Sequence, residues 1–440
     1  LVLDALSGDL ILSGDLNVGR SDLELTATGD LVQKSGSTVR SSDGLVSVVA
    51  GSGFTQAAGA GILTTGLDSE IDLDIGGGVV LARAVADTIK INARSGDISS
   101  TLGSSGVVID AEGTLSLSAT GSVGTTGLSG GALNLAAGLL DINAGSDVSV
   151  RGHGDLVVGS FALSGQDVSV SVTTQASDTE DGDLGLSADI ALGRTASVYL
   201  GAAGDLSVTS SRSIDFGDGV VTLDATGTIV LGDSSSITAA DDLSLDASGD
   251  IAMGAGSLVE TTGDVLSVST EGTLLVESLR ANMVSGTVLV GAVGDVSVRA
   301  LSVGGSHVTA DRLVISSRDG SVGSSVGLGG MIYLNADVNS LAGSADTGLA
   351  IRATGDLEIT AQPPLGYDMV SAGGLIGRSV SAGYLGLSTS SGDLYLDVLG
   401  ALTVASSSAN GDGFGIHAGR DLTISVSGDL SLGAGIGAAD

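Results

Sequence analysis

The sequence has no cysteine, no tryptophan and only two prolines among its 440 residues. Without cysteine there is no disulfide framework, and a long stacked core needs none. Aromatic residues make up 2% of the chain, too few for the aromatic core of an immunoglobulin-like sandwich. No apolar run approaches the ~20 residues of a membrane-spanning helix. These absences argue against a disulfide-rich domain, against a string of immunoglobulin-like domains and against membrane insertion of this segment.

Basic residues are also scarce. The chain has 16 Lys and Arg against 51 Asp and Glu, which gives a formal net charge of -35 at pH 7. Such a surface repels nucleic-acid phosphates and anionic lipid headgroups, and it attracts divalent cations. We therefore expect no nucleic-acid partner.

Glycine and small apolar residues are abundant instead. The chain contains 72 Gly, and 42% of its residues are hydrophobic. This apolar content is too high for a disordered linker, so the Gly and Ser residues mark frequent turns within a folded chain.

The pattern Asp-Leu-x-Leu-x-(Ala/Val/Gly)-x-Gly-Asp, with close variants, recurs along the whole chain. Examples are Asp22–Asp30, Asp147–Asp155, Asp242–Asp250 and Asp421–Asp429. A small unit repeated this often is typical of a stacked array, in which each unit buries its apolar face only against its neighbours.

The repeat at residues 242–253 illustrates how two strands of a coil are encoded. Leu243 and Leu245 alternate with Ser244, which predicts a strand with one buried face. We expect the following Gly249 to supply a positive φ for the corner, and Asp250 to accept hydrogen bonds from nearby backbone amides. A second strand then begins at Ile251.

Equivalent strands recur after about 20 residues, as from Val148 to Val168. This period predicts an all-β fold, a parallel β-solenoid of roughly 22 coils that forms an elongated rod. We expect one continuous domain over residues 1–440. An antiparallel sandwich would need hairpin turns, and a leucine-rich horseshoe would need a helical stretch in each repeat. Neither pattern occurs in this sequence.

The chain resembles the large bacterial exoproteins of the filamentous haemagglutinin type. The resemblance rests on Asp22–Asp30, Gly204–Val208, Gly294–Val298 and the variants between them. It implies a right-handed parallel β-helix that is secreted or held on the bacterial cell surface. It also implies a role in adhesion, biofilm or the stalk of a contact-dependent toxin, with a glycan or protein receptor on a host or neighbouring cell as partner.

These patterns favour a structural or adhesive shaft, or a fibre-forming segment of an extracellular matrix, over an enzyme. The repeat is present at Leu1–Asp4 and persists to Leu430–Leu432, so we expect an interior segment of a longer protein or a mature fragment. Open solenoid ends would favour head-to-tail self-association. The alternative is a β-helical polysaccharide lyase or hydrolase that uses paired carboxylates. The regularity of the Gly-Asp corners argues against it, because an active site is a local departure.

Two acidic stretches are candidates for special roles. The side chains of Asp178, Glu180, Asp181 and Asp183 lie in a candidate loop that could bind Ca²⁺ as a cofactor, although the spacing is not that of an EF-hand. In the other stretch, Asp68, Glu70, Asp72 and Asp74 alternate with apolar residues, which predicts four carboxylates on the outer face of one strand. For both stretches the alternative is a solvated acidic face. The isolated histidines, His153, His307 and His417, predict no transition-metal site.

The repeat is interrupted after Ala361, and we expect a loop insertion near residues 361–384. Pro363, Pro364, Tyr367 and Met369 lie on it. Such residues anchor interfaces at low entropic cost, so the loop is a candidate partner-binding site. The alternative is a neutral insertion at a coil corner.

Overall fold

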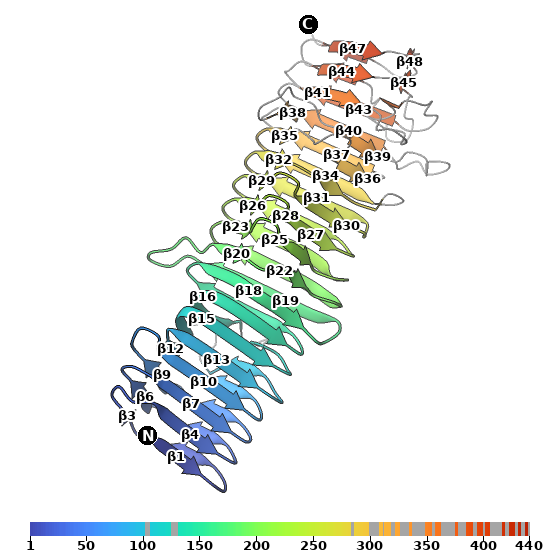
Figure 1. Ribbon diagram of the computed structural model, residues 1–440. Helices are drawn as coiled ribbons and strands as arrows, with labels where there is room; N and C mark the ends of the chain where they lie inside the picture. The colour runs from blue at the N-terminus through green and yellow to red at the C-terminus, as the bar shows by residue number, and fades with distance from the viewer. Residues whose placement is uncertain are drawn as a thin grey trace. The chain divides into compact units, whose positions relative to one another are not determined.

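The computed structural model confirms an all-β fold of stacked parallel strands, without helix in the part of the chain that it describes. Strands of successive coils run side by side in the same direction (Figure 1). The structure describes residues 1–101, 106–124, 131–282 and 286–297 with their side chains. From residue 298 onward, Val308 apart, it describes the backbone of the strands alone.

The coils are longer than predicted. In the parallel β-solenoid that the described strands form, equivalent residues of successive coils lie about 23 residues apart. Leu25 pairs with Val48, and Val48 with Leu73. The predicted period of about 20 is short because the corners differ in length: the three-stranded coil from Val48 to Leu73 takes 25 residues, whereas the one from Ile71 to Ile89 takes 18.

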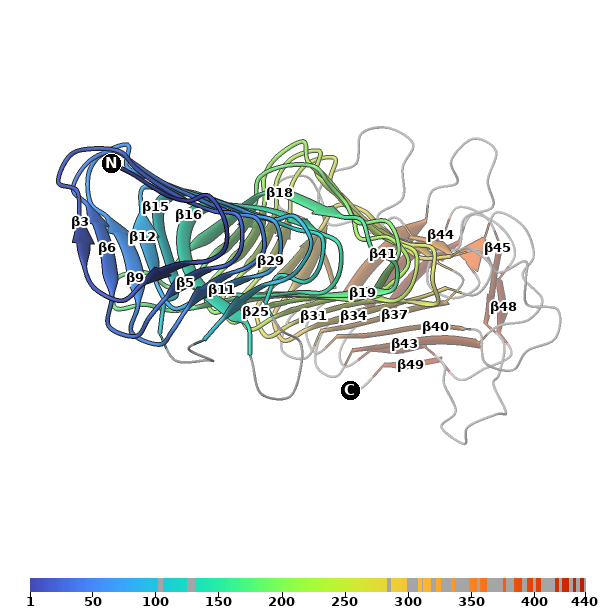
Figure 2. The same cartoon turned by 90° about the horizontal axis from the view of Figure 1, so that it is seen from below.

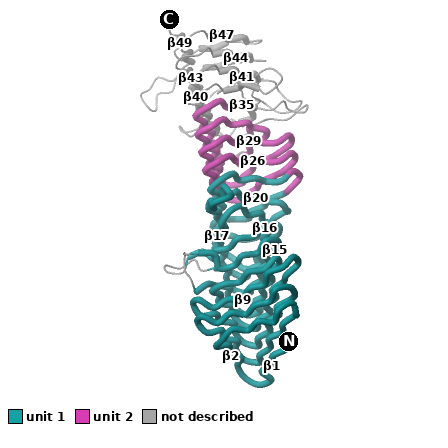
Figure 3. The backbone as a smooth tube through the Cα atoms, turned by 90° about the vertical axis from the view of Figure 1, so that its left-hand side faces the viewer, with its two compact units in different colours: residues 1–209, 213–219 teal, residues 210–212, 220–440 magenta. Residues whose placement is uncertain are grey.

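The strands form two compact units (Figure 3). Unit 1 comprises residues 1–209 and 213–219, and unit 2 comprises residues 210–212 and 220–440. Each unit is a stack of coils with its own apolar interior. The single continuous domain stays a prediction.

The first coils of unit 1 have three sides, and each side is a parallel ladder. The first ladder holds β1 (Val2–Ala5), β4 (Leu23–Ala27), β7 (Leu45–Ala50), β10 (Glu70–Ile75) and β13 (Thr88–Ala93). The second holds β2 (Leu10–Leu12), β5 (Leu31–Gln33), β8 (Phe54–Gln56), β11 (Val79–Leu81) and β14 (Ile98–Ser100). The third holds β3 (Leu16–Asn17), β6 (Thr38–Ser41), β9 (Gly61–Thr64) and β12 (Ala84–Ala86).

The middle of unit 1 changes cross-section. Two long strands, β15 (Ile109–Ala119) and β16 (Leu133–Ala144), each cover two sides of the coil. The following coils have two strands per turn, because β17 (Val148–His153) leads directly to β18 (Leu156–Leu163). Three-sided coils return with β19 (Val168–Gln175), β20 (Leu184–Leu186), β21 (Ile190–Ala191), β22 (Thr195–Ala202), β23 (Leu206–Val208) and β24 (Ser213–Asp215).

Unit 2 repeats the three-sided coil. One ladder holds β25 (Val220–Ala225), β28 (Leu243–Ala247), β31 (Val265–Thr270), β34 (Thr287–Ala292), β37 (Arg312–Ser317), β40 (Gly348–Ala353), β43 (Tyr384–Thr389), β46 (Ile416–Ala418) and β49 (Ile436–Ala438). A second holds β26 (Ile229–Leu231), β29 (Ile251–Met253), β32 (Leu274–Val276), β35 (Val296–Val298), β38 (Val322–Ser325), β41 (Leu357–Ala361), β44 (Leu394–Val398) and β47 (Leu422–Val426).

The third side of unit 2 is made of shorter ladders. One holds β27 (Ser236–Ala239), β30 (Leu258–Thr261), β33 (Leu279–Arg280), β36 (Val308–Ala310) and β39 (Leu334–Ala336). The other joins β42 (Leu375–Ile376), β45 (Ala401–Val404) and β48 (Leu430–Leu432), and here β42 is antiparallel to β45. This pair departs from the parallel pairing that the sequence predicts.

Inward aliphatic side chains stack in columns along each unit. Leu243 and Leu245 are 1% and 0% exposed and Ser244 faces outward, which confirms the alternation read from the sequence. Leu245 pairs with Leu223 in the preceding coil and with Val268 in the next. Burying one such side chain stabilises the fold by about 1.5–3 kcal/mol. Columns of aliphatic residues fill most of the narrow interior, which explains why the chain needs few large aromatic residues; Phe54 and Phe216 are among those that are buried.

Candidate functional site

The Gly-Asp corners are the most regular polar feature of both units. The Asp97 carboxylate accepts a hydrogen bond from the backbone N–H of Ser122 at 2.7 Å. In unit 2, Asp250 accepts one from the N–H of Thr273, also at 2.7 Å. Each donor lies one coil further along the chain. The predicted hydrogen bonds to nearby backbone amides are confirmed, and the amides belong to the next coil, because the strand spacing brings that coil within reach of a short carboxylate. The same bond joins Asp9 to Asp30, Asp22 to Leu45, Asp30 to Gly53, Asp147 to Ser169, Asp183 to Asp205, Asp233 to Ala255 and Asp242 to Val265.

The glycine of the motif makes room for this bond. A Cβ placed on Gly121 would overlap the Asp97 carboxylate, and one on Gly272 would overlap that of Asp250. Neither glycine has a positive φ. Gly249 does not have one either; a Cβ there would meet the carbonyl oxygen of Gly227 at 2.8 Å. The expectation that this glycine supplies a positive φ was wrong. We call this pairing, an Asp of one coil seated against the Gly of the next, the corner interlock.

The corner interlock predicts a specific coupling at Gly204 and Asp183. A Cβ on Gly204 would overlap the Asp183 carboxylate, which caps the amide of Asp205 at 2.8 Å. We expect Gly204→Ala and Asp183→Ala each to destabilise the protein by about 1–3 kcal/mol. In the double variant Gly204→Ala/Asp183→Ala, the new Cβ no longer overlaps a carboxylate. Its loss of stability should therefore be about 1 kcal/mol smaller than the sum of the two single losses.

Urea denaturation of the four proteins measures this cycle. Gly185→Ala is the matched control, because a Cβ there meets nothing closer than 3.5 Å. Strict additivity of the two losses would contradict the interlock at this corner.

The predicted Ca²⁺ loop is fastened by backbone amides. Glu180 Oε2 accepts a hydrogen bond from the N–H of Asp155 at 3.0 Å. In return, Asp155 Oδ1 accepts from the N–H groups of Gly182 at 3.1 Å and Asp183 at 3.0 Å. Asp178 and Asp181 are exposed. Among the described residues, no group of three or more His, Cys, Asp or Glu side chains is placed to hold a metal ion. The structure gives this loop a fastening role at the corner after β17.

We expect the fold to be insensitive to Ca²⁺, because the carboxylates that hold the loop are already satisfied by amides. The midpoint of thermal unfolding should differ by less than about 1 °C between excess chelator and millimolar Ca²⁺, since only a ligand that binds the folded state shifts it. An increase of several degrees with Ca²⁺, lost in the Asp178→Asn/Asp181→Asn variant, would contradict this expectation and support a Ca²⁺ site in the loop.

The acidic strand β10 is paired with cations of the next coil. Glu70, Asp72 and Asp74 face outward as expected, but Asp68 precedes the strand in a turn with φ +63°. Lys90 Nζ lies 2.7 Å from Glu70 Oε1, and the Arg94 guanidinium binds Asp74. Two of these carboxylates therefore pair across coils. Such exposed pairs contribute about 0–1 kcal/mol each.

The pKa values of Asp15 and His153 are both lowered, and the cause of each shift is visible in the structure. The hydroxyl of Thr38 donates to Asp15 Oδ1 at 2.6 Å and the amide of Thr38 at 2.9 Å, and these bonds hold the pKa of Asp15 below its usual value. Burial lowers the pKa of His153, and the charge of Arg151 lowers it further. The His153 Nε2 atom is buried without a hydrogen-bond partner among the described residues. His307 and the side chain of His417 lie outside them.

The Thr38 hydrogen bonds predict a pH effect of definite sign. Because the folded-state pKa of Asp15 is lowered, its contribution to stability is present above the unfolded-state pKa and is lost as the pH falls through the folded-state pKa. In Thr38→Val, which lacks the hydroxyl, the pKa of Asp15 should rise toward its ordinary value. A carboxyl carbon NMR titration measures it, with Thr55→Val as the control. An unchanged pKa would contradict this assignment.

The structure contains a buried glutamine pair that the sequence analysis did not predict. Gln33 and Gln56 are both 0% exposed and end strands β5 and β8. Gln56 Nε2 donates to Gln33 Oε1 at 3.0 Å, and Gln56 Oε1 accepts from the amides of Ala82 at 2.8 Å and Arg83 at 3.0 Å. The pair satisfies the backbone where the next corner is shorter. The signal in the sequence is a Gln at a position that the alternation reserves for apolar residues.

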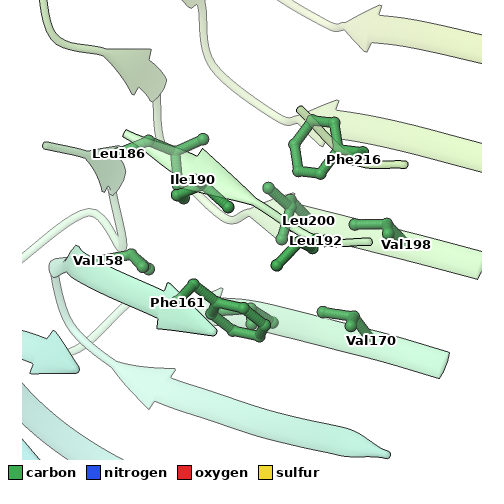
Figure 4. Close-up of a pocket in the computed structure, with 10 residues that line it drawn as sticks. Val158, Phe161, Val170, Leu186, Ile190, Leu192, Val198, Leu200 and Phe216 are labelled. Carbon is green, nitrogen blue, oxygen red and sulfur yellow. The ribbon is translucent and has the colours of Figure 1, made fainter. Parts of the chain in front are cut away.

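A small apolar cavity lies inside unit 1 beside β21, where the third side resumes (Figure 4). Phe161, Ile190, Leu192 and Phe216 are among its lining residues, and no polar side chain lines it. Its volume is about 10 Å³, the lower limit for a single water molecule. It is a packing gap without the charged groups that a glycan-cleaving site needs.

The predicted partner-binding residues Pro363, Pro364, Tyr367 and Met369 lie outside the described residues. Around them, paired residues of successive coils are separated by more positions in the sequence than in other coils. Ile351 of β40 pairs with Leu387 of β43, and Ile315 of β37 pairs with Ile351. Each step is 36 residues, against about 23 in other coils. The contact role of these residues stays a prediction.

Within the described residues, no helix is long and apolar enough to cross a membrane. No family model, no curated protein and no solved structure matches the chain. The resemblance to exoproteins of the filamentous haemagglutinin type therefore stays a prediction from the repeat.

Proposed function

We propose that the chain is a shaft or fibre-forming segment of a bacterial surface or secreted exoprotein of the filamentous haemagglutinin type, acting in adhesion, biofilm or extracellular matrix. The observation that carries this proposal is the corner interlock, which recurs in both units. Each coil caps amides of the next, so the stack extends by one coil without new chemistry. Structures built in this way are suited to spanning distance and presenting surfaces.

The distribution of polar groups supports a structural role over an enzymatic one. The carboxylates at the corners are occupied by backbone amides of the next coil, and those on β10 are occupied in part by Lys90 and Arg94. General acid-base catalysis instead needs a carboxylate or imidazole that is free to contact a substrate. On this proposal the chain has no catalytic activity, and its regular carboxylates serve the fold.

The net charge of -35 narrows the class of partner. A strongly acidic surface is kept from nucleic acid and anionic lipid by repulsion. The proposal therefore assigns it a glycan or protein receptor on a host or neighbouring cell, and a location outside the cell or on its surface. Head-to-tail polymerisation stays a prediction of the sequence.

A shaft should tolerate the removal of one whole coil. Leu223 and Leu245 are register partners, so deleting residues 224–245 joins equivalent positions of neighbouring coils. We expect the shortened chain to unfold cooperatively, because each coil contacts only its neighbours. Beads coated with it should adhere to epithelial cells or bacterial lawns as well as beads coated with the full chain, and better than albumin-coated beads.

Two outcomes would contradict the shaft proposal. One is adhesion no greater than that of albumin on every surface tested. The other is the release of new reducing or unsaturated ends from a panel of acidic and neutral glycans, which would favour a lyase or hydrolase instead.

A further inference from the structure

An uncharged row of side chains runs along the outer face of the second ladder of unit 1. Its members are register partners from successive coils, one per strand, and β5 and β11 lie on the same side of the unit in Figure 2. In the first of these strands Ile11 is 56% exposed. The row consists of Ile11, Val32, Thr55, Val80 and Ser99. In a chain with 51 acidic residues, a row of this length without charge leaves a face that can approach another protein.

The two borders of this row carry opposite charges. At the start of the strands lie the exposed carboxylates of Asp9, Asp30 and Asp97. At the end of the strands lie the exposed cations of Lys34 and Arg83. Neither cation forms a salt bridge with any residue that the structure describes.

We propose that this face pairs two copies of the chain side by side. The row repeats at the strand spacing of about 4.8 Å, and a second β-solenoid presents side chains at the same spacing. A second copy also brings the opposite charges to each border. The contact is therefore an isologous interface, in which the same patch is used on both copies.

The charged borders decide the direction of pairing. With the two-fold axis along the stacking direction, the two stacks run parallel and their strands run in opposite senses. The acidic border of one copy then faces the basic border of the other. With the two-fold axis along the strands, the stacks run antiparallel and acidic border meets acidic border, which is repulsive. The parallel arrangement is the one that the charges favour.

The small size of the face makes the pairing weak in dilute solution. One side chain from each of the strands β2, β5, β8, β11 and β14 covers much less than the roughly 800 Å² per partner of a stable interface. Anchoring many copies on one surface raises their effective concentration. Side-by-side pairing goes beyond the shaft proposal, and it does not depend on which receptor the protein binds.

Sedimentation equilibrium of the full chain up to about 1 mM tests the pairing. We expect the average mass to rise toward that of a dimer. Thr55→Lys places a charge in the centre of the row and should weaken association by roughly tenfold or more. Ser47→Lys is the matched control: it lies on the adjacent side of the same coil, between the register partners Glu24 and Asp72, and should leave association unchanged. A strictly monomeric chain at all concentrations would overturn the proposal, as would equal effects of the two substitutions.

Cysteine cross-linking tests the direction, since the chain has no cysteine of its own. In the parallel pair, Ile11 faces Ile11 of the second copy, so Ile11→Cys should form a disulfide dimer on mild oxidation. In an antiparallel pair, Ile11 would instead face Ser99 of the second copy. The Ile11 residues of the two copies would then lie four coils, or roughly 19 Å, apart along the stack. Cross-links formed only in a mixture of Ile11→Cys and Ser99→Cys proteins would overturn the parallel arrangement.

Discussion

The structure depends on one constraint, which is that every backbone group at a coil corner must find a partner although the ladder is interrupted there. Within the strands, the ladders of neighbouring coils satisfy the backbone. At the corners a short carboxylate takes over and accepts the amide of the next coil, as Asp97 does for Ser122. A buried or half-buried amide without a partner costs about 1–3 kcal/mol. Because each coil presents an equivalent backbone N–H at its corner, the Asp recurs in many coils.

Glycine and aspartate are coupled by this geometry. Their pairing in the sequence gives the impression of a turn motif in which each residue acts locally. In the structure the Asp of one coil acts on the Gly of the next, since Gly204 is the residue that leaves room for Asp183. The motif therefore specifies the stacking of coils as well as the bend in each one. This is why its regularity fits a structural role, and why its many carboxylates are poor candidates for acid-base chemistry.

Where the coil departs from its usual length, other polar side chains replace the interlock. Gln56 reaches into the interior and caps the shortened corner at Ala82. Glu180 and Asp155 exchange hydrogen bonds with backbone amides and fasten the longer loop before β20. Variation in coil length is thus accommodated at the corners, and the inward aliphatic columns continue past it. The outward-facing side chains, such as those of the uncharged row, can then differ from face to face without disturbing the core.

The parallel stack, the strands and their buried faces could be predicted from the sequence, because a two-residue alternation and a repeated corner are local patterns. Leu243 and Leu245 could be placed inside from their neighbours alone. The predicted coil is too short, since the third strand is only two to four residues long and carries little periodicity. The sequence could not place the partners of Asp250 or the row from Ile11 to Ser99. Those depend on which residues the stacking brings together across about 23 positions, and the tertiary structure alone decides that register, because corner lengths differ from coil to coil.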